Sequence, residues 1–476
     1  MLFSSTIFLF VFLPLTLFIY YVSPRFLKNT ILLIASLLFY AWGEPVYTFV
    51  MITSIIMNYT FGLLVDRYRE DIKIAKWLVG AMVLGNVLLL SVFKYTSFII
   101  ENVNAVFRLG LTDPMIPLPI GVSFFTFQAM SYVIDVYRKE GKVQRNPLDL
   151  ALYISLFPQL IAGPIVRYQT VADEINERKE TLDDFASGVQ RFVIGLGKKM
   201  ILANSCGYVA DQAFSQSSGD LSTGFAWIGI IAYSLQIYFD FSGYSDMAIG
   251  LGRMFGFHFL ENFNYPYISR SVSEFWRRWH ISLGSWFRDY VYIPLGGNRG
   301  GAVSTYRNLA VVWLLTGVWH GASWTFIAWG AYYGMFIMLE RAFLGKWLKA
   351  LPSALSLGLT LFIVIIGWVF FRADNFGYAI TYLQAMFGLS EGGLWDSQAM
   401  YYLSQYGIIL LISIIAATPL PKMLGEYILT LEERSNKTWV VASAGFLRYG
   451  YLSLVLVFAV SYVVASSFNP FIYFRF

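Results

Sequence analysis

The sequence predicts an all-α polytopic membrane protein with about eleven spanning or re-entrant helices in a single domain. Of its 476 residues, 57% are hydrophobic and 13% are charged, whereas roughly a quarter of the residues in a soluble domain are charged. The second observation is a series of charge-free runs, several of which reach the roughly 20 residues that cross a hydrocarbon core. Backbone groups in lipid must bond internally, and these runs do not alternate as barrel strands do, so the spans must be helices.

The charge-free runs give the positions of the expected spans. They are Val46 to Val65, Trp77 to Phe93, Leu221 to Phe239, Asn308 to Leu339, Ala350 to Phe371 and Tyr449 to Phe474. The first apolar run, Met1 to Pro24, has no positive residue ahead of it, so we expect a retained span and not a signal peptide. Arg25 and Lys28 follow it directly, which favours an N-terminus outside and a first loop in the cytosol.

Composition also excludes several classes of function. The net charge of +5 is spread over loops, so the lipid bilayer and not nucleic acid is the expected partner. The only cysteine, Cys206, excludes an internal disulfide, and no two histidines have the spacing of metal ligands, so we expect no metal site. The sequence also lacks a nucleophile elbow and a phosphate-binding loop, which disfavours serine-hydrolase and ATP-driven chemistry.

Proline and glycine break two of the apolar stretches, at residues 114–121 and 156–164. Non-helical backbone at membrane depth persists only where protein buries it or water reaches it. Two interpretations stay open. The breaks indicate either re-entrant helices around a cavity or a pair of kinked packing helices.

One of the three histidines, His280, lies in an aromatic and basic segment that runs from Ser273 to Tyr290. Helical spacing puts four aromatic residues and a leucine on one stripe and pairs Glu274 with Arg278 on another face, so we predict one interfacial helix. A simple membrane anchor explains the aromatics and arginines equally well. The stripe consists of Trp276, Trp279, Leu283, Trp286 and Tyr290.

A second histidine, His320, lies inside the charge-free run from Asn308 to Leu339. That run is long enough for two helices that meet at residues 317–323, which would place an imidazole on irregular backbone at membrane depth. Imidazole suits a general base that takes a hydroxyl proton during acyl transfer, and depth limits hydrolysis. A hydrogen-bonded structural histidine remains the alternative, while for His258 we expect a packing role.

Two carboxylates, Asp240 and Asp246, fall at the end of an apolar run. They could orient a histidine or fix a re-entrant turn, and a salt bridge to an arginine of the segment from Arg253 to Arg307 is equally compatible with the sequence. The last eleven residues, 466–476, are aromatic-rich. Such tails often lie in the membrane interface, but Tyr473 could instead reach a cavity and accept an acyl group.

Together these motifs resemble the bacterial membrane-bound O-acyltransferase family, and in particular its alginate O-acetyltransferase branch. The resemblance covers nearly the whole chain and is most specific in the block from Glu261 to Arg299, with the motif Trp319-His320-Gly321 and the opening Met1 to Ser5. It implies a funnel through the bacterial cytoplasmic membrane, with His320 catalytic and His280 a second important residue at the tunnel. We expect Asp240, Asp246, Trp319, Arg277 and Asn298 to line this tunnel and orient the substrate.

The resemblance also implies substrates and partners. Acetyl-CoA or another acyl thioester is the expected donor, with no bound cofactor and no metal, and a partner similar to SGNH hydrolases outside the membrane would complete transfer to a surface polysaccharide. The ending from Phe471 to Phe476 looks like the Phe-x-Tyr-x-x-Phe ending of relatives in which the tyrosine is proposed to carry the acyl group.

These observations give one mechanism and two rivals. We expect His320 to act as general base on the Tyr473 hydroxyl, which attacks the thioester before the acyl group passes to the partner. A D-alanyl transferase for teichoic acid would keep this chemistry with another donor. A polysaccharide transporter or export channel would account for the broken helices without any acyl transfer.

Overall fold

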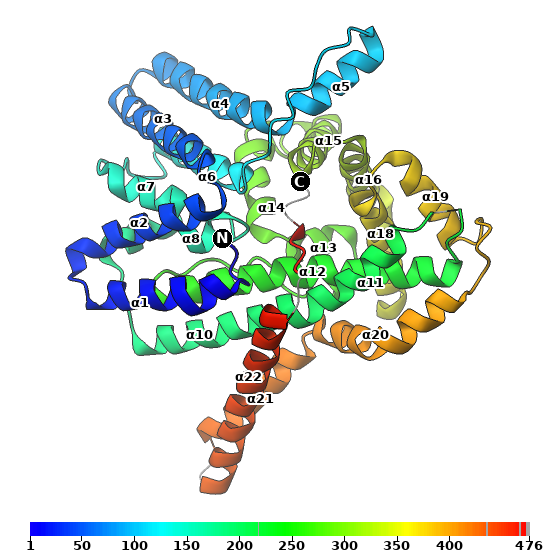
Figure 1. Cartoon of the computed structure of the whole chain (residues 1–476). Coiled ribbons are helices and arrows are strands. Elements are labelled where there is room, and N and C mark those ends of the chain that lie inside the picture. The colour runs from blue at the N-terminus through cyan, green and yellow to red at the C-terminus, as the bar shows by residue number, and fades with distance from the viewer. Residues whose placement is uncertain (218, 435–436, 466–467, 473–476) are drawn as a thin grey trace. The chain divides into compact units, whose positions relative to one another are not determined.

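The computed structural model describes residues 1–217, 219–434, 437–465 and 468–472, and every regular element among them is a helix (Figure 1). This confirms the predicted all-α class. The chain forms two compact units: residues 1–192 with 247–260, and residues 193–246 with 261–476. Two of the three boundaries fall inside continuous helices, α10 (Leu182–Gly197) and α12 (Thr223–Met254). The single domain over residues 1–476 stays a prediction.

The protein is a multi-pass membrane protein. Seven of the helices in the described part of the chain are long and apolar enough to span a membrane, and Phe8–Val22 forms a shorter apolar helical stretch. The predicted total of about eleven stays a prediction. The sequence analysis missed α2 and α20 as spans. The seven helices are α2 (Arg25–Gly43), α3 (Tyr47–Arg67), α4 (Ile72–Lys94), α12, α18 (Ser353–Arg372), α20 (Ser397–Ala416) and α22 (Thr438–Ala465).

In the first unit, a pair of buried asparagines joins two of the helices that are long enough to span a membrane. In α3 and α4, the amides of Asn58 and Asn86 are fully buried and donate to one another over 3.1 and 2.9 Å, a type of bond that holds helices together in lipid. Besides these two helices and α2, the unit contains η1 (Phe8–Phe12), α1 (Leu13–Val22), α5 (Thr96–Phe107), α6 (Val122–Arg138), α7 (Pro147–Ser155), α8 (Phe157–Leu160), α9 (Tyr168–Glu177), the start of α10 and the end of α12.

The predicted breaks are present in this unit. No helix covers residues 108–121, and α7 and α8 are separated at Leu156 and span only nine and four residues. All residues from 156 to 166 are buried, so the surrounding protein shields this backbone from lipid. Interrupted helices are therefore confirmed. That these breaks border a cavity stays a prediction.

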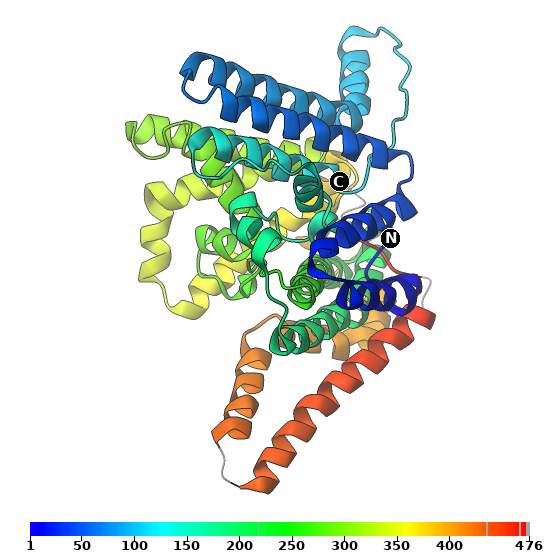
Figure 2. The same cartoon turned by 90° about the vertical axis from the view of Figure 1, so that its left-hand side faces the viewer.

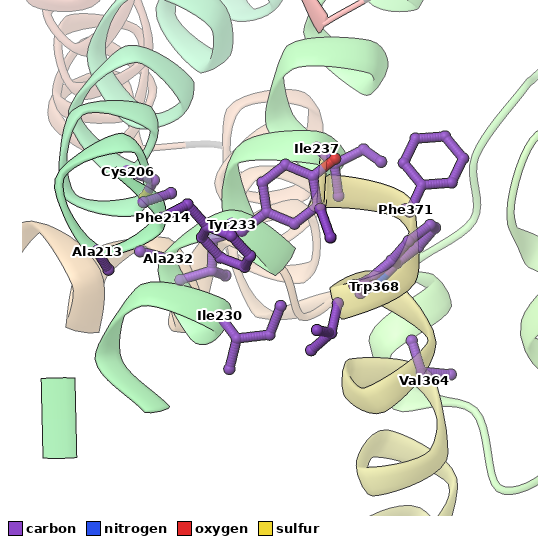
Figure 3. Packing of buried hydrophobic residues seen from close by; sticks show 14 of the residues in the cluster. Cys206, Ala213, Phe214, Ile230, Ala232, Tyr233, Ile237, Val364, Trp368 and Phe371 are labelled. Carbon is purple, nitrogen blue, oxygen red and sulfur yellow. The ribbon is translucent and has the colours of Figure 1, made fainter. Parts of the chain in front are cut away.

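The second unit has an apolar core between α11 (Asn204–Phe214), α12 and α18, as Figure 3 shows. The core includes Cys206, which is fully buried. The other labelled side chains are Ala213, Phe214, Ile230, Ala232, Tyr233, Ile237, Val364, Trp368 and Phe371. The remaining helices are the end of α10, η2 (Lys198–Ala203), η3 (Pro266–Ile268), α13 (Val272–Arg278), α14 (Ile281–Phe287), η4 (Arg288–Tyr292), α15 (Gly301–His320), α16 (Trp324–Leu339), η5 (Glu340–Leu344), α17 (Gly345–Ala350), α19 (Phe376–Met386), α20, α21 (Leu420–Arg434) and α22.

The helices α15 and α16 confirm the prediction that residues 308–339 form two helices meeting near His320. They pack closely through glycines: a Cβ on Gly317 would come within 2.5 Å of the Phe326 carbonyl oxygen, and one on Gly330 within 2.5 Å of that of Trp313. Small residues at such crossings let two backbones approach in a membrane. The crossing therefore fixes the end of α15, where His320 lies.

The helices α21 and α22 pack against one another at the end of the chain (Figure 2). No residue of α21 is buried, and Ala444 and Ala459 are the only buried residues of α22 among the side chains that the structure describes. An apolar helix with so little protein around it has lipid as its natural solvent. After α22, the described chain resumes at Phe468.

Candidate functional site

The aromatic segment that carries His280 is broken at that residue. α13 ends at Arg278, α14 begins at Ile281, and His280 between them has left-handed φ and ψ values of 45° and 55°. The predicted single interfacial helix is therefore wrong. Trp279, Leu283 and Trp286 are at most 5% exposed, so this stripe packs inside the protein. The Glu274–Arg278 pair of the prediction is present at 2.9 Å.

Two side chains, Ser271 and Glu340, bind the backbone N–H groups at the start of α13. The Ser271 side chain accepts the N–H of Glu274 at 3.1 Å, as a helix cap does. The buried carboxylate of Glu340 accepts the N–H groups of Val272 and Ser273, the latter at 2.9 Å. A negative charge at a helix N-terminus is favourable, so Glu340 anchors the helix that ends next to His280.

The non-helical segment around Asn262 binds the backbone on both sides of this break. The Ile281 N–H donates to the Asn262 carbonyl at 3.0 Å, and the Asn264 N–H donates to the Arg278 carbonyl at 2.9 Å. The Asn262 side-chain Oδ1 accepts the backbone N–H of Ser282 at 3.2 Å and lies 3.2 Å from Nδ1 of His280. Because that oxygen is an acceptor, Nδ1 of His280 carries the proton in this contact and Nε2 carries the lone pair.

His320 ends α15 and lines a small pocket with aromatic walls. Three rings meet the imidazole edge to face: Trp319 at 4.8 Å, Trp329 at 4.9 Å and Phe371 at 5.2 Å between centroids. The imidazole is thus fixed by aromatic packing and 7% exposed. The pocket is lined by Ile237, Phe241, Trp279, His320, Trp329, Trp368, Phe371 and Ile472.

Two side chains connect His280 to this pocket. Phe241 of α12 lines the pocket and packs edge to face on His280, with centroids 4.6 Å apart. Trp319 lies 6.2 Å from the His280 ring and 4.8 Å from that of His320. The structure therefore brings both predicted catalytic histidines and the predicted tunnel residue Trp319 into one aromatic cluster.

The aspartates of α12 have partners that the sequence analysis did not predict. Asp240 Oδ1 lies 2.6 Å from Lys199 Nζ, and Asp246 Oδ2 lies 2.6 Å from Lys198 Nζ. Both lysines belong to η2, whereas the salt bridge left open by the sequence was to an arginine of the segment 253–307. The predicted re-entrant turn is wrong, because both aspartates lie within one continuous helix, α12.

The end of the described chain reaches the same pocket. Phe471 and Ile472 are 4% and 6% exposed, and Ile472 lines the pocket together with His320. The Ile472 N–H donates to Asp240 Oδ2 at 2.9 Å. Tyr473, the predicted acyl acceptor, lies outside the described residues and follows Ile472 directly in the sequence.

Two residues that were predicted to line the tunnel are exposed and are not part of the lining of the His320 pocket. Arg277 is exposed on α13. Asn298 is exposed and accepts hydrogen bonds from Tyr292 and, at 3.0 Å, from Arg341. Among the residues that the structure describes, no group of three or more His, Cys, Asp and Glu side chains could hold a metal ion. The absence of a metal requirement stays a prediction.

His258 lies in the first unit and does not have the packing role expected from the sequence. Its side chain is 52% exposed, and its Nδ1 and Nε2 lie 2.9 and 3.2 Å from carboxylate oxygens of Glu174 and Asp184. Burial by itself would lower the pKa of His258, but its contacts with both carboxylates outweigh that effect and raise the pKa above 6.5. His258 is therefore part of an exposed ion-pair cluster.

Sequence reasoning missed Asn262, Lys199 and Glu340. Asn262 and Glu340 bind residues that are distant in the sequence, and the residues next to them in the sequence do not indicate a partner. Lys198 and Lys199 did give a usable signal. Two cations within an apolar stretch of a membrane protein need counter-charges, and the aspartates of α12 were the obvious candidates.

Comparison with known proteins identifies the family of the chain. The family model described as "MBOAT, membrane-bound O-acyltransferase family" matches residues 135–380. The chain is 42% identical to "Probable alginate O-acetylase AlgI" of Azotobacter vinelandii over 100% of both chains, and 34% identical to "Peptidoglycan O-acetyltransferase" of Helicobacter pylori over 100% of this chain and 98% of that one. It is also 30% identical to "Teichoic acid D-alanyltransferase" of Bacillus subtilis over 54% of this chain and 69% of that one. The chain belongs to the membrane-bound O-acyltransferase family and is an acyltransferase of a multi-pass membrane type.

Proposed function

We propose that this protein transfers acetyl groups from a cytosolic thioester to a cell-surface polysaccharide, from the cytoplasmic membrane of a bacterium. The observation that carries the proposal is the shared pocket of His320 and Ile472, because Ile472 directly precedes the candidate acyl acceptor Tyr473. The relatives named as alginate and peptidoglycan O-acetylating enzymes, which match the chain over its full length, favour acetyl as the group and a polysaccharide as the acceptor.

In the proposed reaction His320 takes the proton from the Tyr473 hydroxyl as its oxygen attacks the thioester carbonyl carbon. The carbon–sulfur bond breaks, the thiolate leaves and takes the proton from His320, and acetyl-CoA is thereby converted into acetyl-Tyr473 and free CoA. The aromatic walls of the pocket limit the access of water, which would otherwise hydrolyse the thioester. No resident cofactor is required, because acetyl-CoA is a substrate.

The acetyl group then leaves the tyrosine. A serine of an extracytoplasmic partner similar to SGNH hydrolases attacks the aryl ester, the Tyr473 hydroxyl is regenerated, and the partner passes the acetyl group to the polysaccharide. A phenolate is a better leaving group than an alkoxide, since the pKa of phenols is near 10, so transfer from tyrosine to serine is favourable. His280, Asp240 and Asp246 contribute to the shape of the site.

A D-alanyl transferase is the second candidate. The similarity to teichoic acid D-alanyltransferases covers about half of this chain at 30% to 32% identity, less than the full-length similarity to O-acetylating enzymes. Its chemistry at His320 would be the same. The two candidate functions are distinguished by whether the protein accepts a donor labelled in an acetyl group or one labelled in a D-alanyl group.

The proposal is tested by incubating the purified protein with acetyl-CoA labelled in the acetyl group and analysing the C-terminal peptide by mass spectrometry. We expect the label on Tyr473 in the unaltered protein and none in Tyr473→Phe. The His320→Ala variant should label at least about 100-fold more slowly, within the range that general-base catalysis contributes. An active preparation without label on Tyr473 would rule out the relay.

A further inference from the structure

A nearly inaccessible ion pair lies beside the C-terminal tail in the second unit. The side chains of Lys199 and Asp240 are each 2% exposed, and their charged atoms are 2.6 Å apart. At this distance the two groups form an ion pair. Burying two charges in this way is unfavourable unless further polar groups surround them.

Those further polar groups come from the tail. Lys199 Nζ donates to the Pro470 carbonyl oxygen, and Asp240 Oδ2 accepts the N–H of Ile472 at 2.9 Å. The Lys199 ammonium also lies 5.8 Å from the centre of the Phe471 ring. The pair therefore contacts three successive residues of the tail and binds a backbone donor and a backbone acceptor.

The local structure brings Lys199 to Asp240. Lys199 lies in the π-helical turn η2, a type of turn that often occurs at functional sites. Gly243, on the turn of α12 that follows Asp240, lets η2 approach: a Cβ there would come within 2.8 Å of the Gly195 carbonyl oxygen and 3.1 Å of the Lys199 nitrogen. A side chain at position 243 would separate the two helices and pull Lys199 away from Asp240.

We propose that the Lys199–Asp240 pair is the docking site of the C-terminal tail, which fixes the backbone of residues 470–472 beside the His320 pocket. This rests on the proposed function in that Tyr473 is taken as the acyl carrier. Because these hydrogen bonds are to backbone groups, they determine which residues of the tail lie at the pair. Ile472 contributes to the pocket, and the pair positions it there.

The neighbouring pair, Lys198 with Asp246, gives a matched comparison. Its distance is the same, 2.6 Å, but its side chains are 27% and 12% exposed, and its lysine directly precedes Lys199 in the chain. The two pairs differ in burial, and Lys199 and Asp240 are the residues that bind the backbone of Pro470 and Ile472.

The test measures amide hydrogen exchange of the C-terminal peptide in the full-length protein. The double variant Lys199→Met with Asp240→Leu removes both charges together, because a single substitution would leave the other charge buried and alone. We expect the peptide to exchange at least about tenfold faster than in the unaltered protein, the factor for losing a hydrogen bond to a charged group. Exchange in α15 and α16 should stay unchanged, as should exchange at Phe471 and Ile472 in Lys198→Met with Asp246→Leu.

A second variant acts from the tail and leaves the buried pair intact. Ile472→Pro removes the N–H that Asp240 accepts, and we expect the remaining amides of the peptide to exchange faster by a similar factor. Unchanged exchange in both variants would overturn the docking site. The two proposals can fail separately. If exchange is faster in the variants but the unaltered protein never acquires label on Tyr473, the docking site is upheld and the acyl relay is overturned.

Discussion

Oδ1 of Asn262 lies 3.2 Å from Nδ1 of His280, and the same oxygen accepts the backbone N–H of Ser282. The Ser282 hydroxyl also donates to it at 2.9 Å. One amide oxygen therefore contacts His280, which lies in the break between α13 and α14, and Ser282 in the first turn of α14, and it directs the lone pair of His280 to Nε2. Asn262 is a positioning residue for His280, although it does not line the His320 pocket.

Replacing Asn262 tests this relationship. Asn262→Leu removes the acceptor, so the imidazole loses its fixed tautomer, and we expect acyl transfer to fall by about tenfold or more, within the contribution of a positioned imidazole. Asn262→Asp keeps an oxygen acceptor at that place and should retain most of the activity. Initial rates with labelled acetyl-CoA measure both variants. Equal losses in Asn262→Leu and Asn262→Asp would contradict the assignment.

The crossing of α15 and α16 predicts a strong effect of a single methyl group. Gly330→Ala places a Cβ 2.5 Å from the Trp313 carbonyl oxygen, and since backbone cannot move aside easily, we expect a destabilisation of about 1–3 kcal/mol. The apparent melting temperature in detergent and the rate of acyl transfer should both fall. Gly358→Ala in α18 is the matched control, because no atom lies within 4 Å of its Cβ. If the two variants behave alike, the glycine crossing does not position His320.

His258 predicts a pH-dependent contribution to the stability of the first unit. Its pKa is raised above 6.5 in the folded protein, so protonation is favoured by folding, and the stabilisation is fully present below about pH 6.5 and lost as the pH rises through the raised pKa. Because the side chain is half exposed, the effect should be at most about 1 kcal/mol. Apparent melting temperatures at several pH values measure it.

The matched variant for this measurement is His258→Gln. It keeps a polar side chain that can bond to Glu174 or Asp184 but does not titrate. We expect the difference in melting temperature between acidic and alkaline pH to shrink relative to the unaltered protein. A variant with the same pH dependence would show that other groups cause it.

The sequence predicted the positions of the membrane-spanning helices better than the contacts between helices. Long charge-free runs gave α3, α4 and α18 with bounds close to those observed, because apolar length directly reflects hydrocarbon thickness. The turn at His320 was also predictable, since one helix could not account for the 32 residues from Asn308 to Leu339. These features depend on composition and local pattern alone.

The break at His280 could not be predicted in that way. The segment around it contains neither proline nor glycine until Gly284, so its periodicity indicates one helix. The chain adopts a left-handed conformation at His280 because Asn262 and Glu340, which are distant in the sequence, bind the backbone on either side. Likewise, two aspartates in α12 were recognised as unusual, but their lysine partners follow from the contact of η2 with α12.

The most direct test of the central claim measures acetate released by mild base from the surface polysaccharides of cells. The strains compared are the parent, one lacking this gene, and the latter carrying the unaltered gene, His320→Ala or Tyr473→Phe. If His320 and Tyr473 pass acetyl groups to the polymer, released acetate falls on deletion and returns only with the unaltered gene. Full return of acetate with His320→Ala, present in the membrane at the normal level, would contradict the account.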